Sequence, residues 1–279
     1  MKLLYSVPVS NQSATFYLPV GLYGTLQVEY DVVTSTGQTM TRADAGNILL
    51  NWNGEDIINV DAEILNLLDN VYGGVAEASF QTAAANRMTV IIPCGFWFDS
   101  TNAYYVNNKD RVYLKLDFSS LSAKCSSGNI RIYAKPKLGV MNYIHKIIKR
   151  SVIASGAGSV SDVIPINNVA AIYYKNPSGA NVSDIQLNKD DETFVDSAVK
   201  NLNAYSDWIH LLESTNNTIA VDLCESKDIR ESVGNQLSYK YTFTGAGTLE
   251  QYISFIVFTP LKAAESKQFA SLKLTKQSA

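Results

Sequence analysis

The densest group of side chains that could do chemistry is an acidic segment in the second half of the chain. Residues 188–192 read Asn-Lys-Asp-Asp-Glu, and a further acid follows at Asp196. Carboxylate oxygens gathered in a flexible loop are the ligands that Ca²⁺ prefers, although the spacing lacks the alternating acids and closing Glu of an EF-hand. Asp190, Asp191 and Glu192 are therefore candidate calcium ligands. The alternative is a solvated helix start, where carboxylates favour the positive end of the helix dipole.

No catalytic arrangement accompanies these acids. The two histidines, His145 and His210, belong to no His-x-x-x-His pair, and the chain has no Gly-x-Ser-x-Gly nucleophile motif. The glycine-containing segment 155–159 lacks the Gly-Lys-Ser ending of a phosphate-binding loop. We therefore expect no enzyme activity and no cofactor.

The cysteines predict neither a zinc site nor a disulfide framework. They are Cys94, Cys125 and Cys224. This odd number has no Cys-x-x-Cys spacing and no histidine partner. We expect free thiols in a protein made in a reducing cytoplasm.

The charge distribution argues against binding to nucleic acid. The net charge is −3, and the most basic short run, His145–Arg150, holds three cations. So few cations cannot support strong binding to a polyelectrolyte, and we expect no sequence-specific nucleic-acid partner. An amphipathic connector with its charges in water is the favoured interpretation of this run. Only 18 % of the residues are charged, which suits a molecule that buries much of its surface against neighbours.

An aromatic cluster flanks a polar loop in the first half of the chain. Its members, on either side of residues 99–102, are Phe96, Trp97, Phe98, Tyr104 and Tyr105. Exposed rings at these positions would form a strong contact surface for a protein partner or a sugar. The alternative is that they fill the rim of a β-barrel core. We take them as the candidate interface residues.

Most apolar segments predict strands, because they are short and rich in Tyr, Val, Ile, Phe and Thr. In the first half the predicted strands are 15–19, 25–33, 46–51, 87–93, 111–118 and 129–135. In the second half they are 149–154, 169–174, 183–188, 218–223, 236–244 and 252–259. Convincing helical spacing of apolar residues occurs in Glu55–Leu68 and Glu192–Tyr205, which predicts one helix in each half.

The same pattern occurs twice along the chain. Residues 48–59 return 137 residues later as residues 185–196, and in both copies an apolar strand end runs into a polar turn and then a Glu. Three further pairs keep the same order: 90–94 with 220–224, 112–119 with 237–244, and 130–136 with 254–260. A period near half the chain length indicates two fused copies of one fold, since solenoid repeats are much shorter.

Several strands, one helix and more strands, repeated once, favour an all-β fold over a βαβ arrangement. A chain of 279 residues is long enough for two domains that each hold a core. The predicted architecture is two tandem eight-stranded jelly rolls (β-sandwiches), each with one short inserted helix. We place the first in residues 1–142 and the second, with a C-terminal tail, in residues 143–279.

This arrangement resembles the major capsid proteins of tailless icosahedral viruses with an internal membrane, above all the corticovirus-type and finnlakevirus-type bacteriophage proteins. The resemblance is carried by the paired segments Ile48–Leu68 and Ile185–Tyr205. The paired strand ends Val112–Ser119 and Leu237–Thr244 add to it. It covers most of the chain as pattern and length, without a short signature motif.

The resemblance implies a structural coat protein without enzymatic activity. In that family two jelly rolls stand upright side by side, and three chains form a trimer whose six barrels make a pseudo-hexagonal capsomer. The implied partners are two further copies of the chain, neighbouring capsomers, penton and minor capsid proteins, and an internal membrane facing the shell. The implied location is the virion capsid, after synthesis in the host cytoplasm. Some relatives bind calcium, for which this chain offers the acidic segment 190–192.

Two other functions fit a tandem β-sandwich. The main alternative is a carbohydrate-binding protein with residues 96–105 as its sugar platform, against which stand the unpaired cysteines and the lack of a recognisable signal peptide at Met1–Pro8. The second is a glycoside hydrolase, which needs two carboxylates about 5–10 Å apart across a cleft, and the sequence nominates no such pair. The chain contains no run of eighteen apolar residues, so we expect no membrane-spanning helix.

Overall fold

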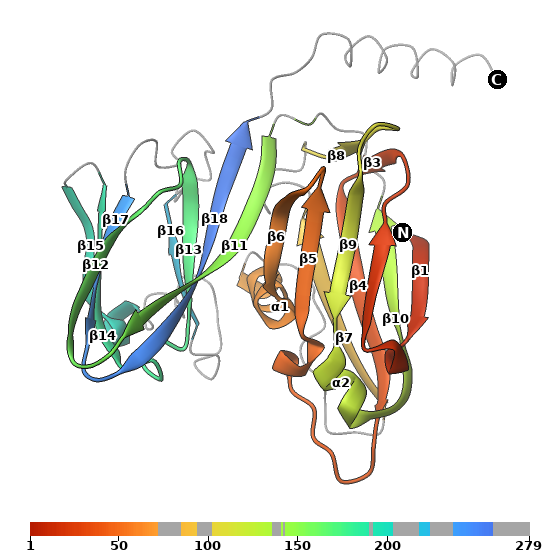
Figure 1. The fold of residues 1–279 in the computed structure, drawn as a ribbon, viewed down its shortest axis with the longest axis horizontal. Helices are drawn as coiled ribbons and strands as arrows, with labels where there is room; N and C mark the ends of the chain where they lie inside the picture. Colours follow the sequence, from red (N-terminus) through yellow and green to blue (C-terminus); the bar gives the residue numbers. More distant parts are fainter. Residues whose placement is uncertain are drawn as a thin grey trace.

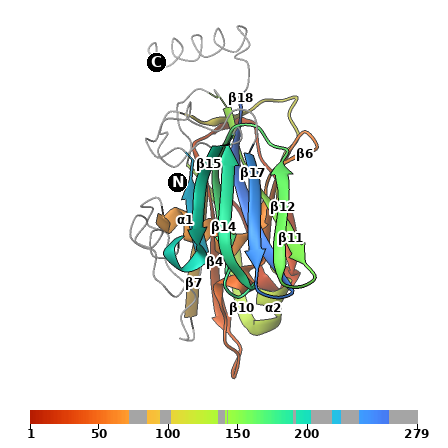
Figure 2. The ribbon, with the colours of Figure 1, turned by 90° about the vertical axis from the view of Figure 1, so that its left-hand side faces the viewer.

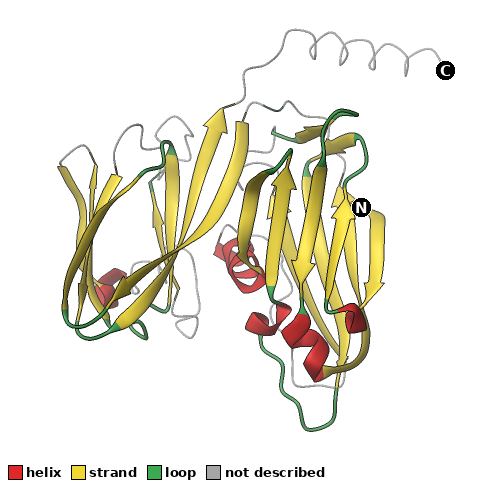
Figure 3. Cartoon of the chain, in the orientation of Figure 1, coloured by secondary structure: helices red, strands yellow, loops and turns green. Residues whose placement is uncertain are grey.

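The computed structural model describes residues 1–71, 85–93, 102–135, 141, 143–189, 192–202, 218–223 and 237–258. These residues form two β-sandwiches side by side, one from each half of the chain (Figure 1). Strands dominate both; short helices lie at one end and on the flank of the first, and a short helical segment lies in the second (Figure 3). None of the helices in the described ranges is long and apolar enough to cross a membrane.

The first sandwich packs two four-stranded sheets against each other. One sheet has the order β1 (Lys2–Pro8), β10 (Cys125–Lys135), β4 (Thr25–Thr34) and β7 (Ala85–Pro93). The other has the order β6 (Glu55–Asp61), β5 (Asn47–Trp52), β9 (Val112–Asp117) and β2 (Ser13–Tyr17). A separate ribbon pairs β3 (Gly21–Tyr23) with β8 (Tyr104–Val106). The helices are η1 (Val9–Asn11), η2 (Arg42–Ala45), α1 (Ala62–Val71) and α2 (Ser119–Lys124).

The second sandwich repeats this plan. One sheet has the order β16 (Thr218–Asp222), β13 (Val169–Lys175), β18 (Gly247–Phe258) and β11 (Tyr143–Ala154). The other has the order β12 (Gly158–Ile164), β17 (Leu237–Phe243), β14 (Val182–Lys189) and β15 (Glu192–Ala198), and faces the viewer in Figure 2.

Both sandwiches have the jelly-roll strand order. Setting the β3–β8 ribbon aside, each half holds eight principal strands in chain order. The first, eighth, third and sixth strands form one sheet, and the second, seventh, fourth and fifth form the other, in both halves. A helix follows the fifth strand in each half, as α1 in the first and as residues 199–202 in the second. The predicted fold of two tandem eight-stranded jelly rolls, each with an inserted helix, is confirmed.

The repeat found in the sequence falls on equivalent strands. The β5–β6 hairpin pairs Leu50 with Ile58, and the β14–β15 hairpin pairs Leu187 with Val195, each residue 137 positions later. Both hairpins have a register shift at the same place, after Leu50 and after Leu187. Since register fixes which face each side chain occupies, the two hairpins correspond residue for residue.

The two predicted helices begin later than expected, because strands occupy their first halves. The predicted helix Glu55–Leu68 is strand β6 up to Asp61 and helix α1 from Ala62. The predicted helix Glu192–Tyr205 is strand β15 up to Ala198, and residues 199–202 are helical. Interpreting Glu192 as part of a helix start was therefore wrong, because it begins strand β15.

A tight turn explains the first of these errors. Asn53 and Gly54 have φ angles of +53° and +93° and connect the paired residues Trp52 and Glu55. Asn-Gly with positive φ at both positions is the strongest short-range signal for a β-hairpin, because its twist matches that of the flanking strands. This signal outweighs the helical spacing of the apolar residues that follow.

The apolar side chains form two buried clusters, one for each sandwich. The cluster of the first sandwich also contains residues from the second half of the chain. These are Ile147, Ala171, Tyr173, Ala220 and Tyr252. They lie on strands β11, β13, β16 and β18, whose other side chains enter the second cluster. The β16-β13-β18-β11 sheet therefore has apolar contacts on both faces and separates the two cores.

The buried carboxylate of Asp44 lies at the end of the first sandwich where η2 and α2 are in contact. Asp44 in η2 accepts hydrogen bonds from Lys124 Nζ at 2.9 Å, from Ser120 at 2.8 Å and from the Thr41 backbone N–H at 2.8 Å. Burial alone would raise the pKa of the Asp44 carboxyl, but these hydrogen bonds outweigh it and hold the pKa below its ordinary value of 3.8.

This lowered pKa predicts a pH-dependent contribution to stability. The unfolded chain binds the proton more tightly than the folded chain, so Asp44 stabilises the fold fully above pH 3.8 and progressively less as pH falls through its folded pKa. Asp44→Asn is expected to lower the free energy of unfolding at neutral pH. On acidification, the free energy of unfolding of the variant should fall less than that of the wild-type protein. Urea unfolding of both proteins from about pH 6 to pH 3 tests this. Parallel curves for the two proteins would contradict it.

Candidate functional site: the junction between the sandwiches and an adjacent hollow

The two sandwiches are joined edge to edge. Strand β11 of the second pairs in parallel with strand β6 of the first, with Ile147 opposite Ile58 and Ile148 opposite Asn59. This pairing makes one continuous eight-stranded sheet from four strands of each sandwich. Ile58 and Ile147 are both fully buried, so the joint is apolar at its centre.

Charged side chains lie around this centre and connect the two halves. Lys149 Nζ lies 3.2 Å from a carboxylate oxygen of Asp61, and Lys175 Nζ lies 2.9 Å from Glu63. The Tyr252 hydroxyl donates to Asp61 at 2.6 Å. We call Asp61, Glu63, Lys149, Lys175 and Tyr252 the junction cluster. Each of these contacts joins a residue of the first half to one of the second.

The junction cluster perturbs its own ionisable groups. Burial acts to lower the pKa of Lys149, but its contacts with Glu250 and Asp61 outweigh this and raise it. Burial, and then the hydrogen bond to Asp61, raise the pKa of the Tyr252 hydroxyl far above its ordinary value of 10. The lysine therefore stays cationic and the tyrosine stays a neutral donor at physiological pH. Lys149 and Tyr252 therefore hold the joint together, since neither of them is poised to exchange protons near neutrality.

The basic run His145–Arg150 is part of strand β11, and the predicted connector with charges in water is wrong for it. His145 is buried, and its Nε2 atom lies 2.7 Å from the Ser254 hydroxyl. Lys146 is also buried and binds Glu55 of the first half. Arg150 pairs with Asp162 at 2.9 Å. Each cation therefore has a carboxylate partner, which leaves little basic surface for phosphate.

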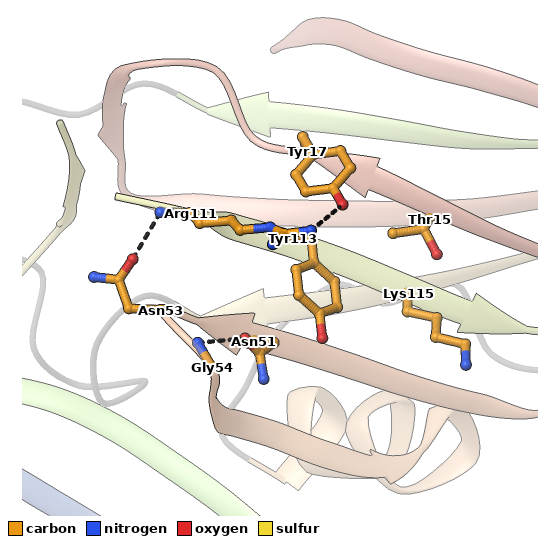
Figure 4. Close-up of a pocket in the computed structure, with 8 residues that line it drawn as sticks. All are labelled: Thr15, Tyr17, Asn51, Asn53, Gly54, Arg111, Tyr113 and Lys115. Atoms are coloured by element: carbon orange, nitrogen blue, oxygen red, sulfur yellow. Dashed lines mark hydrogen bonds between the residues drawn. The ribbon is translucent and has the colours of Figure 1, made fainter. Parts of the chain in front are cut away.

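An open hollow of about 660 Å³ lies on the exposed face of strands β2, β5 and β9. Figure 4 shows the residues that line it, which are Thr15, Tyr17, Asn51, Asn53, Gly54, Arg111, Tyr113 and Lys115. Arg111 donates to the Tyr17 hydroxyl at 3.0 Å, and this bond raises the pKa of the guanidinium. The rings of Tyr17 and Tyr113 lie 5.9 Å apart. Two rings beside a cation can bind a hydroxyl-rich or anionic group, but the hollow holds no nucleophile with an adjacent base.

The aromatic residues predicted as an interface are only partly described. Phe96, Trp97 and Phe98 lie outside the described residues. Tyr104 is fully buried, donates to the carbonyl of His145 at 3.0 Å and meets the Trp52 ring edge-on at 5.5 Å. Its prediction as an exposed contact residue is wrong, because its ring fills the core beside the junction. Tyr105 is half-buried.

Of the predicted calcium ligands, only Glu192 is among the residues that the structure describes. Asp190 and Asp191 lie outside the described residues. Glu192 is exposed and pairs with Lys189 in the hairpin. Among the residues that the structure describes, no three acids, histidines or cysteines come close enough to hold a metal ion. Cys125 is a half-buried free thiol whose pKa burial raises to about 11.

The junction cluster was not predicted from the sequence. Its contacts join residues far apart in the chain, such as Lys149 with Asp61 and Tyr252 with Asp61. The one available signal was the run of residues 169–174, which is apolar at every position and so is typical of a strand buried on both faces. That pattern could have indicated that this sheet faces a second core.

No family model matches the chain, and no curated protein matches its sequence. Solved structures do resemble it. The major capsid protein of bacteriophage PM2 superimposes with a TM-score of 0.66 at 15 % identity, over 94 % of this chain and 97 % of that one. The STIV major capsid protein gives a TM-score of 0.65 at 10 % identity, over 92 % and 96 % of the two chains.

A third solved structure, from the PBCV-1 virus capsid, gives a TM-score of 0.60 at 9 % identity over 88 % of this chain and 89 % of that one. In all three cases the similarity spans both sandwiches, because it covers nearly the whole of each chain. The chain therefore has the double jelly-roll fold of these viral major capsid proteins.

Proposed function

We propose that the chain is the major capsid protein of an icosahedral virion, with a structural and non-catalytic role. The observation that carries the proposal is the repeated jelly-roll order in two sandwiches joined edge to edge, over nearly the full length of the PM2 capsid protein. A rigid double sandwich suits a shell, because each strand is held by its neighbours and the end loops are free to vary between contacts.

The proposed unit of assembly is a homotrimer. Three chains would place six similar sandwiches around one axis, which gives a pseudo-hexagonal unit that tiles a shell. Homotypic contacts within the trimer are expected to be larger and more apolar than contacts between trimers. The further partners that we propose are neighbouring capsomers, penton and minor capsid proteins, with an internal membrane as a possible contact of the inner face. Phe96, Trp97 and Phe98 remain proposed contact residues, and residues 190–192 a proposed calcium site.

The mass of the purified protein in solution tests this proposal. We expect sedimentation or light scattering of the concentrated protein to show a species of about three times 30.6 kDa, or larger shell-like assemblies. A strict monomer that binds glycans on an array would contradict the capsid role and favour the carbohydrate-binding alternative. Tyr17→Ala in the hollow then serves as the control, because it should abolish glycan binding and leave a capsid trimer intact.

A further inference from the structure

We propose that the joint between β6 and β11 within the chain is repeated between chains, where strand β15 of one copy meets strand β1 of the next. The inference rests on the proposed trimer and names the surface that forms it. The supporting observation is the internal repeat. It gives each residue of the β6–β11 joint a counterpart on β15 or on β1, which are edge strands of their sheets.

The two strands have equivalent places in the jelly rolls. In each half the fifth strand ends one sheet and the first strand ends the other. Within the chain, the fifth strand of the first half (β6) pairs with the first strand of the second half (β11). Among the residues that the structure describes, this leaves the fifth strand of the second half (β15) and the first strand of the first half (β1) as unpaired sheet edges. Unpaired edges are templates for pairing with another chain.

The counterparts follow from backbone pairing. The β5–β6 and β14–β15 hairpins correspond at an offset of 137 residues. In the other sheets, the fully buried Tyr30 in β4 corresponds to Tyr174 in β13. In each half this third strand pairs with the eighth strand, and the eighth strand pairs with the first. Following these pairings gives each residue of β11 its counterpart in β1.

A backbone contact at the start of the third strand supports this alignment. Gly24 contacts Lys135 in the first half, and Asn168 contacts Ile256 in the second, through N–H···O bonds of 3.0 Å. These residues have the same offsets, 144 and 121, that the two tyrosines and their eighth-strand partners have.

The first charge pair of the joint keeps its signs. Lys146 binds Glu55 within the chain. Their counterparts are Lys2 in β1 and Glu192 in β15, which are both exposed. Neither makes an ion pair within the described part of one chain, so each is available to the other across a joint between two copies.

The second charge pair reverses both of its signs. Glu63 in α1 lies 2.9 Å from Lys175 in β13. The counterpart of Glu63 is Lys200, and that of Lys175 is Asp31 in β4. Lys200 is exposed, and the Asp31 side chain keeps 34 % of its surface exposed while it pairs with Arg131 at 2.7 Å and with Arg87 at 3.9 Å. A change of sign at one position is matched by a change of sign at the other.

The third charge pair loses both of its charges. Lys149 and Asp61 lie 3.2 Å apart within the chain. Their counterparts are Ser6 and Ala198, two small uncharged residues. None of the three pairs therefore sets like charges against each other after the two halves have diverged, which is expected if the counterparts meet in the assembled protein.

The centre of the joint keeps its apolar character. The paired residues Ile147 and Ile58 have the counterparts Leu3 and Val195. Leu3 is 49 % exposed. Phe194, the counterpart of the fully buried Ile57, is 43 % exposed. Large apolar side chains left open on two edges, at positions that are covered in the internal joint, fit a second copy of this chain better than water.

A joint of this kind is head to tail, because β15 of one copy meets β1 of the next. Heterologous contacts close into a ring when the rotation between copies divides a full turn. Six similar joints, three within chains and three between them, would close the proposed trimer with the same contact throughout.

Charge exchange at the second pair tests the joint in the full chain. Lys200→Asp places two carboxylates together and is expected to weaken trimer association about tenfold. Adding Asp31→Lys should restore association. The control is Lys240→Asp, which changes the net charge by the same amount. Lys240 is exposed, and its counterpart Lys115 is exposed although the internal joint is formed. Sedimentation equilibrium gives the association constant, and urea unfolding verifies that each variant folds.

Cross-linking tests the third pair independently of charge. The Ser6→Cys/Ala198→Cys double variant, treated with a short bismaleimide, should yield covalent trimers. Each single cysteine variant should give only the background of the native thiols. The Ser6→Cys/Lys240→Cys combination, whose sites the proposed joint does not bring together, is the matched control.

The outcomes separate this inference from the proposed function. A wild-type trimer that survives Lys200→Asp and gives no specific cross-link would overturn the joint while the capsid role stands. A wild-type protein that stays monomeric under all assembly conditions would overturn both. Loss of association in Lys200→Asp without recovery in the double variant would also contradict the proposed pairing, provided that the double variant folds.

Discussion

Gly46→Ala is expected to lower the free energy of unfolding by more than about 3 kcal/mol. Gly46 ends η2 with a φ of +75°, and a Cβ atom there would lie 1.9 Å from the carbonyl oxygen of Asp117 in strand β9. Backbone cannot retreat as a flexible side chain can, so the end of η2 would have to move away from the sheet. That movement would also disturb the hydrogen bond that Ala62, the first residue of α1, donates to the Gly46 carbonyl at 2.8 Å.

Gly54→Ala is the matched control for this prediction. Gly54 has a φ of +93°, but a Cβ atom there meets nothing within 4 Å. It therefore measures the conformational penalty alone, about 1–2 kcal/mol. Urea unfolding followed by circular dichroism compares the two variants. Equal losses of stability would show that the contact with Asp117 is unimportant.

Asp61→Ala is expected to cost about 2 kcal/mol of unfolding free energy and to loosen the union of the two sandwiches. Its carboxylate accepts from Tyr252 and lies beside Lys149 and Lys175. Removing it leaves two lysines without this partner. The side chain is 28 % exposed, so the cost lies between that of a surface pair, under about 1 kcal/mol, and that of a broken buried pair, about 3–5 kcal/mol.

Asp162→Ala controls for the loss of a carboxylate. Asp162 pairs with Arg150 at 2.9 Å, but its side chain is 59 % exposed, so its removal should cost less than about 1 kcal/mol. Thermal unfolding with protease digestion measures both effects, since a loosened junction exposes chain between the sandwiches. If the two variants behaved alike, the junction cluster would have no special role in holding the halves together.

Much of the fold could be predicted because interior strands carry their burial in the sequence. Strand β4 alternates half-buried and buried residues from Thr25 to Val32, and the sequence predicted it within one residue. The sequence predicted no strand at β1 or β12 and a helix in place of β15, and all three strands end the four-stranded sheets of their own sandwiches. Edge strands bury less surface, and β12 buries only Ile164, so their alternation is weak.

The repeat was recognisable because it is carried by paired strands, but its register was less secure. Residues 112–119 and 237–244 correspond residue for residue through pairing to β5 and β14. The match of 130–136 with 254–260 connects the correct strands, but it is shifted. It makes Ile130, which lies in the first core, equivalent to Ser254, whereas the backbone pairing makes Ile130 equivalent to Gln251. An odd shift reverses the faces of a strand, and only the neighbouring strand can correct it.

The candidate site could not be predicted, because it consists of contacts between the halves. A lysine in strand β11 and an aspartate in β6 have no spacing that relates them until the sheet is assembled. The aromatic segment was visible in the sequence, but burial of Tyr104 depends on Trp52 and on the backbone of β11. Composition indicates which side chains are available, and the fold decides which of them become surface.

The sheet with apolar contacts on both faces has a consequence for biosynthesis. The first core includes Tyr252 from strand β18, the last strand in the described chain. A nascent chain leaves the ribosome from its N-terminus, so the flank of the first sandwich beside α1 is uncovered until β18 has been synthesised. During that interval chaperones are the natural cover for this flank, and a ribosome that stalls before β18 would leave an aggregation-prone fragment.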